Sequence, residues 1–262
     1  TLKAVSEYFE NTSLDQVTRH DAQKFLNEYG LSHSLATSQK VKGHLSGILK
    51  DAVADGIIKV NPFERAKPHG TNAKDSSLKF LEYTDFKRFI EYLKESHEPT
   101  HDIMLVASLS GARLGEVLAL TPNDIGNGII NISKSYEERL NIVKEPKTPS
   151  SIRTVDVPEW LTDYLLTLSK DNDERLFDRQ QSSVNRELQR ILTRLDIPKR
   201  ITFHGLRHSH ASMLISQGVA VEYISERLGH KDISITQKTY LHLLQVKRNK
   251  EISHTIMLLN LL

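Results

Sequence analysis

The sequence predicts a mainly α-helical protein with a small antiparallel β-sheet, split into an all-α N-terminal domain and a larger mixed α/β domain. Three observations support this fold class. Residues 2–60 show only helical patterns, β-branched runs are confined to residues 128–157, and a polar, turn-rich stretch separates the two regions. The chain of 262 residues also exceeds the usual size of one compact domain. We therefore expect domains at residues 1–66 and 78–262, joined by a linker at residues 67–77.

The clearest helix of the N-terminal domain spans about Ser34 to Val53. Its apolar residues recur every four positions and so share one face, at Val41, Leu45, Leu49 and Val53. The helix should end near Asp55-Gly56, because glycine readily takes the left-handed conformation that closes a helix. The opposite face is polar or small, at Gln39, Lys40, Gly43, His44, Gly47 and Lys50. Taken alone, this face is most simply interpreted as solvated.

Helices and strands are expected in a fixed order in the second domain. Helices should run from Thr84 to Tyr92, from about Asp102 to Ser110 with a stop at Gly111, from Arg113 to Leu120, from Trp160 onward, and from Thr202 to the C-terminus with breaks at Gly218 and Gly229. Between them, β-branched runs predict the strands of one small antiparallel sheet, at Ile129–Ile132, Ile142–Val143 and Thr154–Val157.

Composition excludes several classes of protein. Hydrophobic residues make up 38% and charged residues 26% of the chain, and no apolar run approaches the roughly 20 residues that cross a bilayer, so a soluble, non-membrane protein is expected. The absence of cysteine excludes disulfides and a thiolate nucleophile, and it fits a reducing compartment, for which we expect the cytoplasm. The net charge of +2 does not by itself require a nucleic-acid partner.

Four motifs in the second domain occur in a recognisable order. They are Ser110-Gly-Ala-Arg113-Leu-Gly-Glu116, then His204-Gly-Leu-Arg207-His-Ser-His-Ala-Ser, then Leu228-Gly-His230 and, ten residues later, Tyr240-Leu-His. Together they resemble the catalytic signature of the tyrosine recombinases, the phage integrase family, and Lys147-Thr-Pro-Ser-Ser-Ile-Arg153 resembles the family's β-hairpin lysine segment. Each motif alone is a weak match, but the ordered set is specific.

The chemistry of the reaction explains why these residue types occur together. A phosphoryl-transfer transition state needs positive donors on the non-bridging oxygens, a nucleophile in line with the leaving group and a proton for that leaving group. Arginine stays charged and binds phosphate through two parallel hydrogen bonds, so we assign this task to Arg113 and Arg207. Tyr240 is expected to act as a reversible nucleophile that forms a 3′-phosphotyrosyl bond.

The remaining assignments follow from the resemblance. It gives Lys147 the role of acid for the leaving 5′-oxygen, His204 a part in proton transfer, and His230 a hydrogen bond to the phosphate. Glu116 is expected to orient an arginine or histidine, although a surface position is an alternative. Because the phosphodiester energy is kept in the protein–DNA bond, neither a metal nor another cofactor is expected.

Several alternatives stay open at this stage. His204 and His208 have the i, i+4 spacing of a metal site but lack the glutamate of a His-Glu-x-x-His motif, so metal binding is disfavoured. His208 and His210 are interpreted as packing or surface residues. Hairpin register is uncertain by a few residues, so Lys144 is the fallback for Lys147.

The resemblance covers nearly the whole chain, and residues 1–65 are similar to the family's core-binding domain. It implies a two-domain, C-shaped clamp around double-stranded DNA. Because Lys40, His44 and Lys50 face away from the apolar stripe and phosphates attract basic groups, we expect the helix from about Ser34 to Val53 to enter a DNA groove. The resemblance also implies a homo-tetramer at short paired sites that exchanges strands in two sequential steps. Accessory DNA-bending proteins are potential partners.

The C-terminal segment 252–262 is apolar for a chain end, and family members resemble one another in donating such a segment to a neighbouring subunit. We therefore expect Met257, Leu258 and Leu261 to dock on an adjacent protomer, with packing on their own domain as the alternative.

The expected function is site-specific recombination that integrates or excises a mobile element. A DNA-binding regulator that no longer cuts and a type IB topoisomerase-like enzyme are the alternatives. The chain begins with Thr1 rather than Met, so we expect it to be part of a longer protein. The sequence leaves open whether an arm-binding domain precedes it, whether a phage or a conjugative transposon is the origin, and which DNA site, direction and accessory factors are used.

Overall fold

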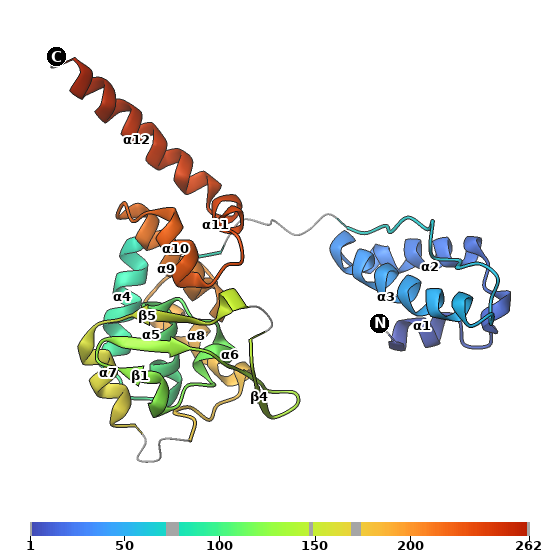
Figure 1. The fold of residues 1–262 in the computed structure, drawn as a ribbon, viewed down its shortest axis with the longest axis horizontal. Helices are drawn as coiled ribbons and strands as arrows, with labels where there is room; N and C mark the ends of the chain where they lie inside the picture. The colour runs from blue at the N-terminus through green and yellow to red at the C-terminus, as the bar shows by residue number, and fades with distance from the viewer. Residues whose placement is uncertain (1, 72–78, 147–148, 169–173, 261–262) are drawn as a thin grey trace. The chain divides into compact units, whose positions relative to one another are not determined.

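The computed structural model of the chain describes residues 2–71, 79–146, 149–168 and 174–260 (Figure 1). Its contacts divide the chain into two compact units, Thr1–Ser77 and Leu78–Leu262. The described residues are mainly helical with small antiparallel sheets, which confirms the predicted fold class.

The first unit consists of helices packed on one small core. Its elements are α1 (Leu2–Tyr8), a 3₁₀ turn (Leu14–Gln16), α2 (Arg19–Ser32) and α3 (Leu35–Ala54). Thr18 caps α2 by accepting a hydrogen bond from the backbone N–H of Asp21, whose carboxylate accepts one from the backbone N–H of Thr18. The core is built around Phe25, Leu26, Val41, Leu49 and Phe63.

Helix α3 follows the pattern that its sequence predicts. Val41 and Leu49 are buried on the apolar face, and the helix ends at Asp55 before Gly56, whose φ of 73° is left-handed. On the other side of the helix Lys40, His44 and Lys50 are exposed, as is Ile48 at 62%. A basic surface of the first unit is therefore carried by one continuous helix.

Residues 67–71, which the sequence assigns to the linker, run along α2 and α3. Lys67 exchanges backbone hydrogen bonds with the side chain of Gln23, and Thr71 pairs with the segment His33–Leu35. Gly70 permits the close approach, because a Cβ at this position would lie 2.3 Å from the backbone nitrogen of Leu35. These five residues thus contribute to the first unit.

The second unit holds most of the helices. They are α4 (Tyr83–Lys94), α5 (Pro99–Ser110), α6 (Leu114–Val117), α7 (Glu159–Leu166), α8 (Gln181–Arg194), α9 (Phe203–Ser216), α10 (Val221–Leu228), α11 (Ile233–Thr239) and α12 (Leu241–Leu259). Helix α6 is shorter than the predicted helix from Arg113 to Leu120, because Arg113 serves as its N-cap and the chain turns at Leu118.

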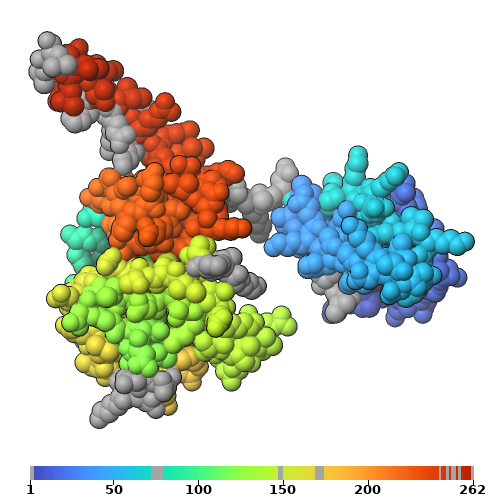
Figure 2. All heavy atoms as spheres, viewed as in Figure 1, coloured from blue at the N-terminus to red at the C-terminus, as the bar shows by residue number. Residues whose placement is uncertain are grey.

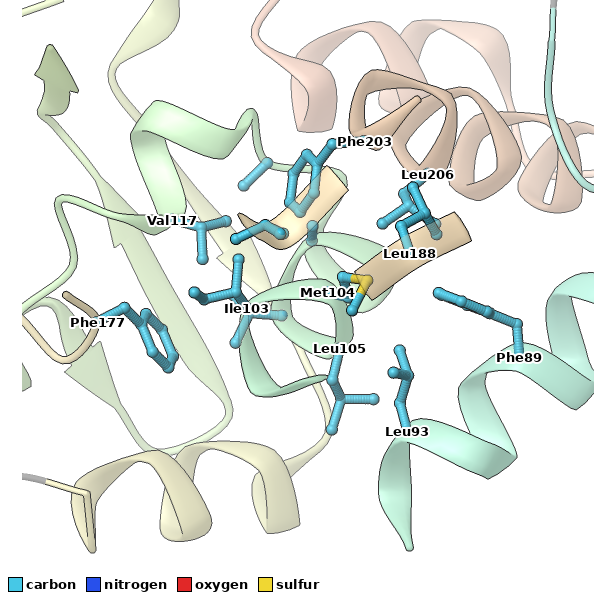
Figure 3. Close-up of a cluster of buried hydrophobic side chains, with 14 of the residues drawn as sticks. Phe89, Leu93, Ile103, Met104, Leu105, Val117, Phe177, Leu188, Phe203 and Leu206 are labelled. Carbon is cyan, nitrogen blue, oxygen red and sulfur yellow. The ribbon is translucent and has the colours of Figure 1, made fainter. Parts of the chain in front are cut away.

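Helix α5 lies at the centre of this unit. Its residues from His101 to Ser108 are buried, and α4, α8 and α9 all pack against it. In Figure 3 the side chains of Ile103, Met104 and Leu105 point in different directions into the cluster, toward residues of the surrounding elements such as Leu188. A helix that is apolar on all sides must be enclosed in this way.

The strands form two separate sheets instead of the single predicted sheet. One has the antiparallel order β1 (Ile125–Gly126), β2 (Ile129–Ile132), β5 (Arg153–Asp156), with Ile130 opposite Val155. The other is a two-stranded ribbon of β3 (Ser135–Glu137) and β4 (Ile142–Lys144). The prediction of one sheet is wrong because β4 pairs with β3, a short strand whose half-exposed residues give no β-branched signal.

A second, smaller cluster of buried side chains joins α9, α10 and the start of α12. Its members are Ala211, Ile215, Ile224, Leu228 and Tyr240, and Leu243 and Leu244 pack against it. Beyond these contacts α12 extends away from α9 to α11 (Figures 1 and 2), and its residues from Ile256 to Leu259 are exposed.

Candidate active site

The turn between α5 and α6 places Arg113. Gly111 ends α5 with a left-handed φ of 71°, and a Cβ there would lie 2.9 Å from atoms of both His210 and Leu228. Arg113 then caps α6, where its backbone N–H and its guanidinium donate to the two carboxylate oxygens of Glu116, at 2.8 and 2.7 Å. The side chain of Arg113 remains 39% exposed, so it can still contact a ligand.

Glu116 is buried between two arginines. Its carboxylate also accepts hydrogen bonds from Arg153 of β5, at 2.8 and 3.3 Å, and the side chain of Arg153 is only 5% exposed. Burial opposes ionisation of Glu116, but hydrogen bonds and charge from Arg153, and then from Arg113, lower the pKa of this carboxyl. Glu116 is therefore a fixed anion that orients Arg113, and it is not a surface residue.

Arg207 projects from α9 into the buried interior of the site. Its guanidinium donates to the carbonyl oxygens of Gly111, at 2.8 Å, and Leu228, at 2.5 Å. Burial, and then repulsion by the positive charge of Arg113, lower the pKa of Arg207. An anion bound between them would relieve this repulsion.

Two histidines border the arginines. His204 lies at the start of α9, and burial followed by the charges of Arg207 and Arg113 lowers its pKa. His230 follows α10, its Nδ1 lies 2.7 Å from the hydroxyl of the buried Thr236, and burial and the same arginines lower its pKa to about 4. Both imidazoles are therefore neutral at pH 7 in the DNA-free protein.

Tyr240 lies between α11 and α12 and is almost fully buried, at 1% exposure. Its hydroxyl forms a 2.8 Å hydrogen bond with Nδ1 of His208. Burial raises the pKa of Tyr240, while the charge of Arg207 lowers it. The hydroxyl is thus neutral in the DNA-free protein and lies within the electrostatic influence of Arg207.

Lys147 lies outside the described residues. The preceding residue, Pro146, lines a hollow of about 270 Å³ together with Arg113 and Glu116. The two neighbouring lysines line the same hollow but are paired: Lys134 with Asp124 at 2.8 Å, and Lys144 with Glu137 at 3.5 Å.

The structure brings together Arg113, Glu116, His204, Arg207, His230 and Tyr240 in the second unit. Lys40, His44 and Lys50 belong to the first unit, on α3. Sequence reasoning missed two residues, Arg153 and His208. Arg153 carried a usable signal, since it stands in the same motif as Lys147, whereas His208 was interpreted as a packing or surface residue.

Two further observations on the described part of the chain concern a metal site and a membrane-spanning helix. No group of three or more histidine or carboxylate side chains is arranged to hold a metal ion there. None of its helices combines the length and the apolar character needed to cross a membrane.

The site holds two guanidinium groups, two neutral imidazoles and a tyrosine hydroxyl. These groups are suited to phosphoryl transfer by way of tyrosine. This chemistry, on a mainly helical fold, defines the class of the tyrosine-dependent DNA strand transferases. Residues 79–247 match the model of the phage integrase family. The chain belongs to this family and is a tyrosine site-specific DNA recombinase, as predicted.

Individual relatives agree with this assignment. The chain is 30% identical to the ICEBs1 integrase of Bacillus subtilis, over 95% of this chain and 73% of the relative. It is 28% identical to a probable prophage ps2 integrase of Lactococcus lactis, over 87% of this chain and 68% of the relative. Among solved structures it is similar to the Tn1549 transposon integrase in complex with transposon right-end DNA, with a TM-score of 0.71 at 18% identity over 95% of this chain and 91% of that one.

Proposed function

We propose that this recombinase integrates or excises a mobile element by cutting and rejoining DNA through a 3′-phosphotyrosyl bond to Tyr240. One observation carries the assignment of residues. The Tyr240 hydroxyl forms a 2.8 Å hydrogen bond with His208 of α9, and the charge of Arg207 on the same helix acts on it. The relatives include the ICEBs1 integrase, a phage integrase, a probable prophage integrase and a transposase of a transposon, which supports the mobile-element setting.

Each residue of the site is proposed to perform a separate part of the reaction. Arg113 and Arg207 hold the non-bridging oxygens of the scissile phosphate, and their charge stabilises the transition state. Tyr240 Oη attacks phosphorus, the bond to the 5′-oxygen breaks, and Lys147 supplies the proton that this oxygen needs. His230 donates a hydrogen bond to the phosphate, His204 assists proton transfer, and Glu116 keeps Arg113 in place.

The two units are proposed to enclose duplex DNA as a C-shaped clamp, with residues 1–66 as the core-binding domain and 78–262 as the catalytic domain. The structures of relatives carry DNA, including a lambda integrase dimer bound to a core site, and this supports binding at paired sites. We propose a homo-tetramer on DNA, two sequential strand exchanges, and accessory DNA-bending proteins as partners. We propose that the enzyme acts in the cytoplasm, where its DNA substrate would be found.

The function is tested with a nicked suicide substrate that traps covalent protein–DNA adducts, followed by a two-site recombination assay. An adduct and joined products are expected. The absence of an adduct would favour a DNA-binding regulator, and an adduct with supercoil relaxation but without recombinants would favour a topoisomerase-like enzyme.

Lys147 is tested by changing the leaving group. Lys147→Ala should slow cleavage of normal DNA by about 100-fold or more, because the 5′-oxygen then leaves without its acid. Replacing the bridging 5′-oxygen by sulfur removes the need for a proton, so the variant should cleave this substrate almost as fast as the parent. Lys144→Ala is the matched control, and rescue of this variant instead would move the acid to Lys144.

Helix α3 is tested by reversing a charge. Lys40→Glu should weaken DNA binding and reduce the slope of log affinity against log salt by about 1, because a phosphate contact is lost. Lys24→Glu, an equal change at an exposed lysine of α2, is the control. Equal salt slopes for parent and Lys40→Glu would restore the interpretation of this face as merely solvated.

The end of α12 is tested by deletion. Met257 and Leu258 are 57% and 49% exposed, which suits docking on an adjacent protomer, while Leu261 lies outside the described residues. Removing residues 253–262 should leave single-site DNA binding intact and weaken the paired-site complex, as measured by native gel mobility. If the deletion instead lowers the thermal stability of the isolated protein, the segment belongs to its own domain.

A further inference from the structure

The Tyr240 hydroxyl has a hydrogen-bond partner, His208, that has no role in the mechanism proposed above. His208 stands one helical turn after His204 on α9, and its Nδ1 lies 2.8 Å from Tyr240 Oη. The rings of His208 and Tyr240 meet at 65° with their centroids 5.9 Å apart. The ring of His204 meets His208 edge to face at 4.7 Å, so His208 stands next to both His204 and the tyrosine.

We propose that His208 is a catalytic residue, the base that takes the phenolic proton of Tyr240 as the tyrosine attacks DNA and returns it during religation. This inference rests on the proposed function of Tyr240. A candidate base must lie within hydrogen-bond reach of the proton it removes, and His208 satisfies this requirement before any DNA is bound. A phenol is also a better donor than a neutral imidazole, so the hydroxyl donates and Nδ1 accepts.

The surroundings of His208 explain why it does not take the proton of Tyr240 when no DNA is bound. Burial, followed by His204 and Arg207, lowers the pKa of His208 to about 4. His230, from the turn after α10, interacts with it electrostatically, and Tyr240 faces it from the start of α12. Because His204, His230 and Tyr240 are neutral at pH 7, the positive charge of Arg207 is the one among these named groups that opposes protonation of His208.

A bound phosphodiester reverses this balance. Its negative charge lies against Arg113 and Arg207 and offsets the positive field that disfavours a proton on His208. The same two arginines favour the phenolate character that develops on Tyr240 Oη. Proton transfer from Tyr240 to His208 is therefore coupled to the arrival of the scissile phosphate, so the DNA-free enzyme keeps the buried tyrosine neutral.

The step balances within the site. The Tyr240 O–H bond breaks, a bond from Oη to phosphorus forms, and the bond from phosphorus to the 5′-oxygen breaks as Lys147 protonates that oxygen. The tyrosine proton stays on His208 Nδ1 while the strand is attached. During religation a 5′-hydroxyl attacks phosphorus and returns its proton to Lys147, and His208 gives its proton back to the departing tyrosine oxygen.

Two substitutions separate proton transfer from positioning. His208→Asn keeps a hydrogen-bond acceptor near the position of Nδ1 but cannot take the proton, and His208→Phe keeps the ring volume without either ability. Each is combined with tyrosine or 3,5-difluorotyrosine at position 240, because the fluorinated phenol is more acidic and needs less help to ionise. Adduct formation is followed at single turnover on the suicide substrate.

With tyrosine at position 240, both variants should form adduct about 100-fold more slowly than the parent, at similar DNA affinity. With difluorotyrosine, both should recover to within about tenfold of the equally fluorinated parent. Normal cleavage by the Asn variant beside slow cleavage by the Phe variant would reduce His208 to a positioning residue and overturn the proposal. Slow cleavage by both without recovery would also overturn it, since damaged packing is not repaired by a more acidic phenol.

The same experiment tests the function of Tyr240 and the role of His208 separately. If the parent forms no adduct, or if its Tyr240→Phe variant still does, the proposed function of Tyr240 fails. If the parent and its fluorinated form cleave normally and the His208 variants behave like the parent, only the assignment of His208 fails.

Discussion

Replacing Tyr240 with phenylalanine should abolish the covalent protein–DNA adduct while leaving DNA affinity nearly unchanged. The substitution removes the attacking oxygen and keeps the ring, which packs with Ala211, Ile215 and Leu228. The lost hydrogen bond leaves Nδ1 of the partly buried His208 without its partner, at a cost of about 1–3 kcal/mol in folding stability. Adduct is measured on denaturing gels and affinity by fluorescence anisotropy.

The control for this experiment is Tyr223→Phe, the same chemical change on the neighbouring helix α10, where the side chain is 43% exposed. This variant should form adduct at the parental rate. Adduct formed by the Tyr240→Phe variant would point to another nucleophile and remove the central assignment.

Replacing either arginine should slow cleavage and religation together, by about 10²–10³-fold for each substitution. The same charge is stabilised in both directions, so the two rates should fall in parallel. Arg113→Ala is the safer variant for folding, because the side chain of Arg113 is 39% exposed. For the buried Arg207, Arg207→Lys retains a positive charge but loses the fork that holds the carbonyl oxygens of Gly111 and Leu228.

Single-turnover cleavage and religation of a preformed adduct measure the two directions separately, and thermal unfolding shows whether each variant is folded. Arg200→Ala, at an exposed position, serves as the control. Religation at the parental rate by either variant would show that its arginine does not stabilise the transferred phosphate.

The elements that the sequence predicts well are those with strong local signals. The four-residue repeat of α3 and the glycines at positions 56 and 111 identify the helix faces and ends, because periodicity and left-handed caps are properties of a short segment. The ribbon of β3 and β4 escapes prediction, since its pairing depends on contacts such as Gly115 against Tyr136 that come from another element.

For the site, too, the local motifs are predictable from the sequence and the contacts between distant residues are not. The order of the motifs identifies the residue types, but which side chains touch depends on the fold. His208 is 32 positions from Tyr240, and Arg153 is 37 positions from Glu116. No periodicity or spacing encodes such contacts, so the partner of the nucleophile and the second arginine on Glu116 emerge only in three dimensions.

Two clusters of buried side chains of different size support the two halves of the active site. Arg113 is held at the start of α6, next to Ala112 of the large core, whereas the tyrosine belongs to a group of five buried residues shared by α9, α10 and the start of α12. Opening such a small group costs only a fraction of the free energy of global unfolding. The nucleophile can therefore leave and re-enter as a subglobal fluctuation, while the anion-binding half of the site stays in register.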